Sequence, residues 1–210
     1  MNLYTKDHLL ENKIVYFQPK YGYRSGIEPI ILAAQAIYGS KSILDMGSGC
    51  GPISLILAHR FPNANIVGLE KNILHLELSQ KSKMENKFNN IEFKNEDVCN
   101  LNKNYMNFFD LVLSNPPFFF ENQIIKTKNK SISIAKYISK EKSEKWFNNL
   151  SLTSTSIACS TLAIGGIVLI ILRINNDTPF GLGIGPSLIL GSSDALPWWV
   201  IDTIGKINWC

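Results

Sequence analysis

An apolar run ends abruptly at an asparagine that is followed by two prolines and an aromatic residue. A buried parallel strand is predicted over residues 110–113, and Asn115, Pro116, Pro117 and Phe118 lie just beyond it. Successive prolines supply no N–H to a β-ladder and fix φ near about −65°, so the strand must end there. The amide oxygen of Asn115, the carbonyl of Pro116 and the Phe118 ring then lie where open α/β sheets bind ligands. These groups suit a flat ligand that bears an amino group, such as adenine.

A glycine-rich turn links an earlier predicted strand to a helix. Its spacing is Asp45-x-Gly47-x-Gly49-x-Gly51, and Pro52 follows at a position that suits the first turn of a helix. The glycines permit positive φ and a close approach of the backbone to a ligand. A dinucleotide fingerprint requires glycine where this chain has Pro52, so nicotinamide binding is disfavoured.

Carboxylates follow two further predicted strands. The strand over 65–69 leads to Glu70, which we expect to accept hydrogen bonds from both hydroxyls of a ribose, as acids do in other nucleotide-binding sheets. A short alternating strand beginning at residue 91 leads to Asp97, with Glu96 as the alternative acid at that strand end.

These strands, turns and helices alternate in one run with a repeat of roughly 25 residues, which is typical of βαβ units. Each feature alone is weak evidence, because tight turns and helix caps also use glycine and acids. Together they predict an α/β fold: a doubly wound, mostly parallel, Rossmann-like sheet with helices on both faces. We expect one domain over 1–210, with an N-terminal arm and helix (1–40), a core (41–174) and a divergent tail (175–210).

The glycine turn resembles the first motif of class I S-adenosylmethionine-dependent methyltransferases. The N-terminal arm is similar to the entry segment of the bacterial tRNA adenine-N6 methyltransferases that modify the adenosine beside the anticodon of a valine tRNA. The matching arm reads Gln18-Pro19-x-x-Gly22-Tyr23-Arg24-x-Gly26, with Leu32-Ala33-Ala34 after it. The resemblance spans about residues 17–173. The family usually has Asp where Glu28 stands, and often Tyr where Phe118 stands.

This resemblance implies S-adenosylmethionine as the cofactor and tRNA as the partner. The glycine loop would pass under the methionine end of the cofactor, Glu70 would bind its ribose, and Asp97 would accept from its adenine amino group. Asn115 would contact both the cofactor and the substrate amino group, and Phe118 would stack on the base. Arg24 has two open roles: a permanent cation beside the cofactor pocket, or a salt bridge that closes the arm.

A lysine-rich segment directly follows the Asn-Pro-Pro-Phe bend. It holds Glu141 and Glu144 and seven lysines: Lys126, Lys128, Lys130, Lys136, Lys140, Lys142 and Lys145. A basic loop beside a base pocket suits a phosphate backbone, which favours an RNA substrate. A solvated lysine-rich loop and helix is the alternative, since the net charge of the whole chain is only +4.

Composition favours a cytoplasmic enzyme. The chain has 210 residues, 45% of them hydrophobic, which is enough to bury a core without disulfides. Its four cysteines and three histidines show no metal-ligand spacing, so no metal site is expected. Cys50, inside the glycine turn, is expected to be a small filler and not a nucleophile.

A charge-free run covers 146–172, with Gly165 and Gly166 dividing it. Its serines and threonines argue against a membrane span and favour a helix, a turn and then a buried strand over about 167–172. Only 38 residues follow Leu172, and from Thr178 to Cys210 the only charged residues are Asp194, Asp202 and Lys206; 187–191 could form a short strand. The carboxyl-terminal part of the sheet is therefore expected to be shortened.

Three other functions fit the same motifs. Guanine-N2 methyltransferases of ribosomal RNA and glutamine-N5 methyltransferases of release factors also present Asn-Pro-Pro-aromatic to a planar amino or amide group. A cofactor-binding module without turnover is the alternative from a different class. The sequence leaves the oligomeric state open.

Overall fold

A seven-strand sheet forms the centre of the part of the chain that the computed structural model describes, which is residues 3–36, 39–117, 119–120, 137–153, 158–164, 167–173 and 189–190. The strand order is β11-β9-β10-β6-β3-β4-β5. The strands are β3 (Ser42–Met46), β4 (Asn65–Leu69), β5 (Ile91–Lys94), β6 (Leu111–Ser114), β9 (Ala158–Ile164), β10 (Ile167–Arg173) and β11 (Ile189–Leu190). The first four of these run parallel, whereas β10 is antiparallel to β6 and to β9. The two-residue β11 pairs parallel with β9.

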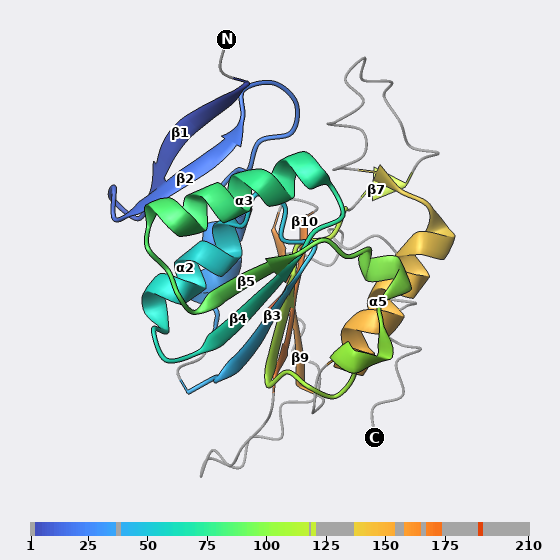
Figure 1. Ribbon diagram of the computed structural model, residues 1–210. Helices are drawn as coiled ribbons and strands as arrows, with labels where there is room; N and C mark the ends of the chain where they lie inside the picture. The colour runs from blue at the N-terminus through green and yellow to red at the C-terminus, as the bar shows by residue number, and fades with distance from the viewer. Residues whose placement is uncertain are drawn as a thin grey trace.

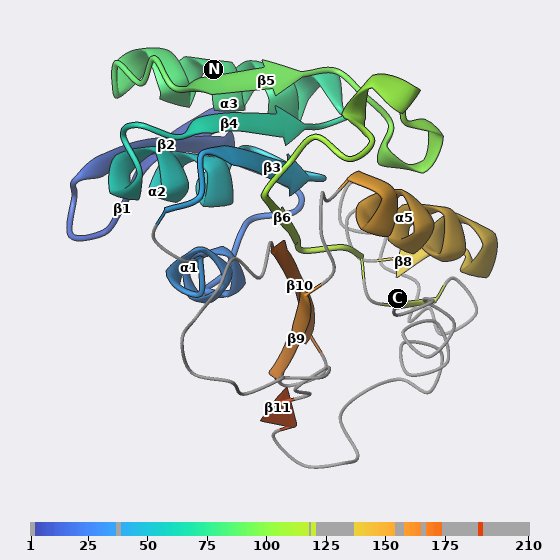
Figure 2. The ribbon, with the colours of Figure 1, turned by 90° about the horizontal axis from the view of Figure 1, so that it is seen from below.

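Helices cover both faces of this sheet (Figures 1 and 2). One face carries α1 (Glu28–Ala34), α2 (Pro52–Arg60) and α3 (Ile73–Glu85). The other carries α5 (Lys140–Thr153) with two short 3₁₀ turns, η1 (Val98–Asn100) and η2 (Lys103–Tyr105). The predicted doubly wound α/β fold with a mostly parallel central sheet is confirmed.

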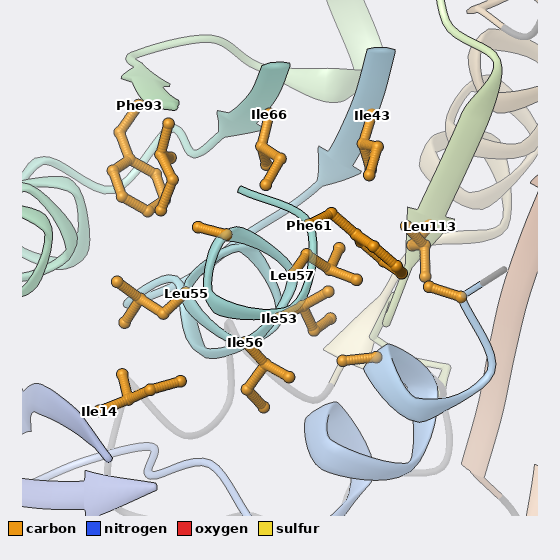
Figure 3. Close-up of a cluster of buried hydrophobic side chains, with 14 of the residues drawn as sticks. Ile14, Ile43, Ile53, Leu55, Ile56, Leu57, Phe61, Ile66, Phe93 and Leu113 are labelled. Atoms are coloured by element: carbon orange, nitrogen blue, oxygen red, sulfur yellow. The ribbon is translucent and has the colours of Figure 1, made fainter. Parts of the chain in front are cut away.

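Helix α2 is surrounded by apolar side chains (Figure 3). Every residue from 52 to 58 is buried, because the helix lies between the sheet and the N-terminal hairpin. Ile43 and Ile66 pack on it from the parallel strands, and Ile14 packs on it from the hairpin. Since the glycine turn leads directly into α2, this packing fixes the turn against the sheet.

The N-terminal arm is an antiparallel hairpin of β1 (Tyr4–Leu9) and β2 (Ile14–Pro19). It packs on α3, where the N–H of Phe17 donates to Ser82 Oγ at 3.0 Å and the N–H of Val15 donates to Asn86 Oδ1 at 2.8 Å. A second small pair, β7 (Phe119–Phe120) and β8 (Tyr137–Ile138), is parallel. The arm is therefore anchored to the helix that follows Glu70.

The charge-free run differs from its prediction in the first half. The strand predicted over 167–172 is present as β10, beside β6, but a helix over the whole stretch before Gly165 is wrong. Helix α5 ends at Thr153, and 158–164 forms β9. The β-branched Thr161 and Ile164 favour a strand here, and pairing with β10 supplies the backbone hydrogen bonds.

The tail can be compared with its prediction only in part. Ile189 and Leu190 form β11 inside the predicted short strand. The rest of 174–210 lies outside the described residues, so a shortened end of the sheet stays a prediction. Among the helices described, none is both long and apolar enough to span a membrane.

Candidate functional site

The predicted site residues come together at one edge of the parallel sheet. Met46, the last residue of β3, pairs with Ser114 on β6 and with Leu69 on β4. The glycine turn, Glu70 and Asn115 directly follow these three residues, so they lie side by side. This is the edge at which open α/β sheets bind ligands.

Close packing requires glycine at two positions of the loop, Gly47 and Gly51, whereas Gly49 faces open space. Gly47, Gly49 and Gly51 have φ of +75°, +59° and +83°. A Cβ atom at Gly47 would lie 2.6 Å from the ring of Trp146, and one at Gly51 would lie 2.6 Å from the ring of Phe93. At Gly49 a Cβ would meet no described atom within 4 Å. A ligand can therefore approach the backbone at Gly49.

Asp45 is fully buried at the end of β3. Its Oδ2 accepts from the N–H and the Oγ of Ser54, at 3.2 and 2.7 Å. Burial raises the pKa of Asp45 to about 7, although the bonds from Ser54 favour the charged form; the nearby Glu70 adds to the rise. The sequence placed Asp45 in the loop motif but did not reveal Ser54, its partner on α2.

This raised pKa predicts a dependence of stability on pH. The pKa is higher in the folded state than its ordinary value of 3.8, so the protonated carboxyl favours folding and its contribution is lost as the pH rises from about 4 through about 7. As the pH rises over that range, the free energy of unfolding of the unchanged protein should fall by up to about 4 kcal/mol more than that of Asp45→Asn. Urea unfolding at several pH values measures both. Parallel curves for the two proteins would contradict the buried, protonated Asp45.

Glu70 ties the loop to the next strand end. Its Oε2 accepts the N–H of Gly49 at 2.9 Å, and its Oε1 accepts the N–H of Asn72 at 2.7 Å. The N–H of Glu96 donates to the backbone oxygen of Glu70 at 3.3 Å. The turns that carry Glu70, predicted to bind the ribose, and Asp97, predicted to bind the adenine, are therefore neighbours. Asp97 Oδ1 caps η1 by accepting the N–H of Cys99 at 3.0 Å.

Asn115 leaves a buried acceptor unused. Its Oδ1 has no hydrogen-bond partner among the described residues, although that atom is buried. Pro116 is buried and Pro117 is half-buried, so the bend is held within the protein. Phe118, predicted to stack on the base, lies outside the described residues.

Unpartnered buried oxygens gather at this edge. Within the described part of the chain, four buried side-chain oxygens lack a partner: Asp45 Oδ1, Ser48 Oγ, Asn115 Oδ1 and Glu28 Oε2. Three of them belong to β3, to the loop after it and to the bend after β6. Buried polar atoms normally have partners, so this group indicates a ligand that supplies hydrogen-bond donors. Ser48 was missed by sequence reasoning, because a serine between glycines carries no distinct signal.

Arg24 has the second of its two predicted roles. Its guanidinium donates to Asp7 Oδ2 and Thr5 Oγ1, both at 2.8 Å, and to the backbone oxygen of Pro19 at 2.9 Å. Gln18 joins the same network through Asp7 Oδ2 at 2.7 Å. The arm is thus closed by the salt bridge, and a direct contact of Arg24 with a cofactor stays a prediction.

Comparison with known families decides the relationship. The family model described as "methyltransferase small domain" matches residues 30–142, which is more than half of the chain. The chain belongs to this family. The matched part includes the glycine loop, Glu70, Asp97 and Asn115.

Relatives of this methyltransferase small domain have more than one substrate in their names. A tRNA1(Val) (adenine(37)-N6)-methyltransferase from a Flavobacteriaceae bacterium is 32% identical over 116 residues, which is 52% of this chain and 48% of that protein. A release factor glutamine methyltransferase from Aliivibrio fischeri is 34% identical over 83 residues, 38% of this chain and 28% of that protein. The chain thus spans about half the length of the first of these relatives and about a quarter of the length of the second.

Solved structures support the fold of the methyltransferase small domain. Pyrococcus horikoshii TYW2 in complex with MeSAdo aligns with a TM-score of 0.53 at 12% identity, over 82% of this chain and 70% of that chain. The putative transferase PH0793 from the same organism aligns with a TM-score of 0.51 at 14% identity, over 77% and 52%. At these identities the likeness concerns the fold alone.

Two negative findings also concern the chemistry of the methyltransferase small domain. Burial raises the pKa of the Cys50 thiol to about 12, and a thiol that is not ionised is a poor nucleophile. Among the residues that the structure describes, no three His, Cys, Asp or Glu side chains are grouped to hold a metal ion.

Proposed function

We propose that this chain is an S-adenosylmethionine-dependent methyltransferase that modifies an exocyclic amino nitrogen, namely adenine N6 beside the anticodon of a tRNA. The observation that carries the proposal is the group of unpartnered buried oxygens on Asp45, Ser48 and Asn115 at the end of β3 and β6. Membership of the methyltransferase small domain family supports it.

The residues at this edge suit the cofactor. S-adenosylmethionine carries donors in its ammonium group, its ribose hydroxyls and its adenine amino group, and the edge offers acceptors and an open backbone at Gly49. The residues that would hold it are Asp45, Gly47, Gly49, Gly51, Glu70, Asp97 and Asn115. When bound, it supplies a methyl group on a positively charged sulfur.

The substrate would be held by the bend after β6. An exocyclic amino nitrogen is a weak nucleophile, because its lone pair is delocalised into the ring. Asn115 Oδ1 and the carbonyl of Pro116 would accept its two N–H groups, which localises the lone pair and aims it at the methyl group. Pro117 would keep the bend rigid, and Phe118 would stack on the base. Alignment and desolvation then provide the catalysis, and no strong general base is required.

A tRNA substrate is supported by relatives and by charge. Several relatives carry the name tRNA1(Val) (adenine(37)-N6)-methyltransferase, in Haemophilus influenzae and Phocaeicola vulgatus as well as in the Flavobacteriaceae bacterium. Lys140, Lys142 and Lys145 lie on α5, the helix that follows the bend in sequence. Lys145 pairs with Glu141 at 2.8 Å, and the lysines between 126 and 136 lie outside the described residues.

A release-factor glutamine is the second candidate acceptor, because release factor glutamine methyltransferases also match this chain at 31–34% identity. A glutamine side-chain amide is planar and has two N–H groups, so the same two acceptors would bind it. The chemistry at Asn115 is common to both candidates, and the acceptor must be distinguished by its product.

Transfer of a labelled methyl group from S-adenosylmethionine to unmodified tRNA tests the proposal. We expect label that ribonuclease removes and protease does not, and N6-methyladenosine after digestion to nucleosides. Label on a release factor would support the second candidate. Cofactor binding with neither product would indicate another acceptor or a module without turnover.

A further inference from the structure

Trp146 lies directly behind the glycine loop. It is in the second turn of α5 and is only 8% exposed. Two carbons of its indole ring lie 2.6 Å from the position that a Cβ of Gly47 would occupy. The ring therefore fills the space that a side chain at residue 47 would need.

The same indole is hydrogen-bonded to β6, the strand that ends just before Asn115. Trp146 Nε1 donates to Ser114 Oγ at 3.0 Å, and Ser114 Oγ donates to the backbone oxygen of Met46 at 2.9 Å. Both groups are buried. Ser114 precedes Asn115 and Met46 precedes Gly47, so one side chain contacts the last residue of β6 and the first glycine after β3.

Helix α5 is also tied to the turn that begins at Asp97. Asn149 Nδ2 donates to the backbone oxygen of Val98 at 2.7 Å. Leu150, one turn beyond Trp146, packs in the apolar cluster on the same face of the sheet. The helix thus has a fixed position behind the edge, and Trp146 is the residue through which it contacts both the loop and the neighbour of Asn115.

We propose that Trp146 is a positioning residue for methyl transfer: its ring supports Gly47 and its N–H, through Ser114, sets the place of Asn115 relative to the glycine loop. This inference rests on the proposed function. A small displacement of a reacting group lowers catalysis far more than it lowers binding, because only aligned groups react.

Trp146→Phe keeps an aromatic ring but removes the donor to Ser114 and the two indole carbons that lie nearest to Gly47. We expect kcat to fall about tenfold, with the dissociation constant for S-adenosylmethionine changed less than about threefold. Ser114→Ala removes the acceptor instead and should also lower kcat. If both act through one hydrogen bond, the double variant should lose less kcat than the product of the two single losses. Additive losses would contradict the shared hydrogen bond.

Leu150→Val is the matched control, because it weakens the packing of α5 in the same apolar cluster but keeps the indole and its hydrogen bond to Ser114. It should lower the midpoint of thermal unfolding and leave kcat unchanged. If Leu150→Val and Trp146→Phe reduce kcat equally, Trp146 has only a structural role and the proposal fails.

A readout that needs no substrate separates this inference from the proposed function. The N–H of Ser48 donates to the backbone oxygen of Leu69 at the end of β4, and the N–H of Gly51 donates to that of Ser48 within the loop, both at 2.9 Å. Hydrogen exchange of these two N–H groups therefore reports how firmly the loop is held. We expect faster exchange in Trp146→Phe than in Leu150→Val. Unchanged exchange would overturn the support of the loop by Trp146. No transfer to tRNA by the unchanged protein would instead overturn the proposed acceptor.

Discussion

Replacement of Asn115 by alanine is expected to lower kcat at least about a thousandfold, because it removes an acceptor that acts on the reacting amino group. The affinity for S-adenosylmethionine should stay within a few-fold, since the glycine loop and Glu70 provide most of the predicted cofactor contacts. Single-turnover methyl transfer and calorimetric titration of the cofactor measure the two effects separately.

Asn115→Asp is the informative companion to this variant. It keeps the acceptor oxygens and adds a charge at a buried atom, so it should keep cofactor binding and recover little of the turnover. Loss of cofactor affinity together with turnover in Asn115→Ala would mean that Asn115 is structural, and the catalytic role assigned to it would be withdrawn.

Replacement of Glu70 by alanine is expected to weaken S-adenosylmethionine binding about a hundredfold, because charge-assisted hydrogen bonds to two ribose hydroxyls are lost. The change also removes the carboxylate that accepts the N–H groups of Gly49 and Asn72, so the loop loses its tie to β4. Calorimetry with S-adenosylmethionine and with S-adenosylhomocysteine measures the loss.

Two further variants test the cause of that loss. Glu70→Gln keeps one acceptor oxygen and should give an intermediate affinity. Glu92→Gln is the control, because Glu92 is an exposed acid on β5 that pairs with Lys94 at 3.2 Å and is not among the predicted ligands. Equal losses for Glu70→Ala and Glu92→Gln would show that net charge, and not a ribose contact, governs the affinity.

The sequence by itself determined the parallel sheet and the order of its turns. Strand and helix periods alternate between residues 42 and 114, and a glycine or proline marks the end of β3, α2 and β6, because the effect of these residues on φ and on the backbone hydrogen bonds is local. Local rules also placed Asp45, Glu70 and Asn115 at strand ends. Since the carboxyl ends of parallel strands share one edge, their proximity followed from the fold class.

Where local signals were balanced, the sequence did not decide. The stretch before Gly165 was expected to be helical up to that glycine, yet 158–164 pairs with β10. β9 and β10 are separated in sequence only by Gly165 and Gly166, and two glycines between apolar runs favour a hairpin, so a local signal for this pairing was present and outweighed the helix prediction.

Only the tertiary structure decided which side chains meet around these strand ends. The salt bridge of Arg24 joins the segment after β2 to Asp7 on β1, and the burial of Asp45 depends on α2 folding over it. Trp146 reaches Gly47 across about a hundred residues of chain, and no spacing rule relates the two positions. Periodicity specifies the face of an element on which a residue lies. The residue that it contacts depends on how separate elements pack, and only the assembled core fixes that packing.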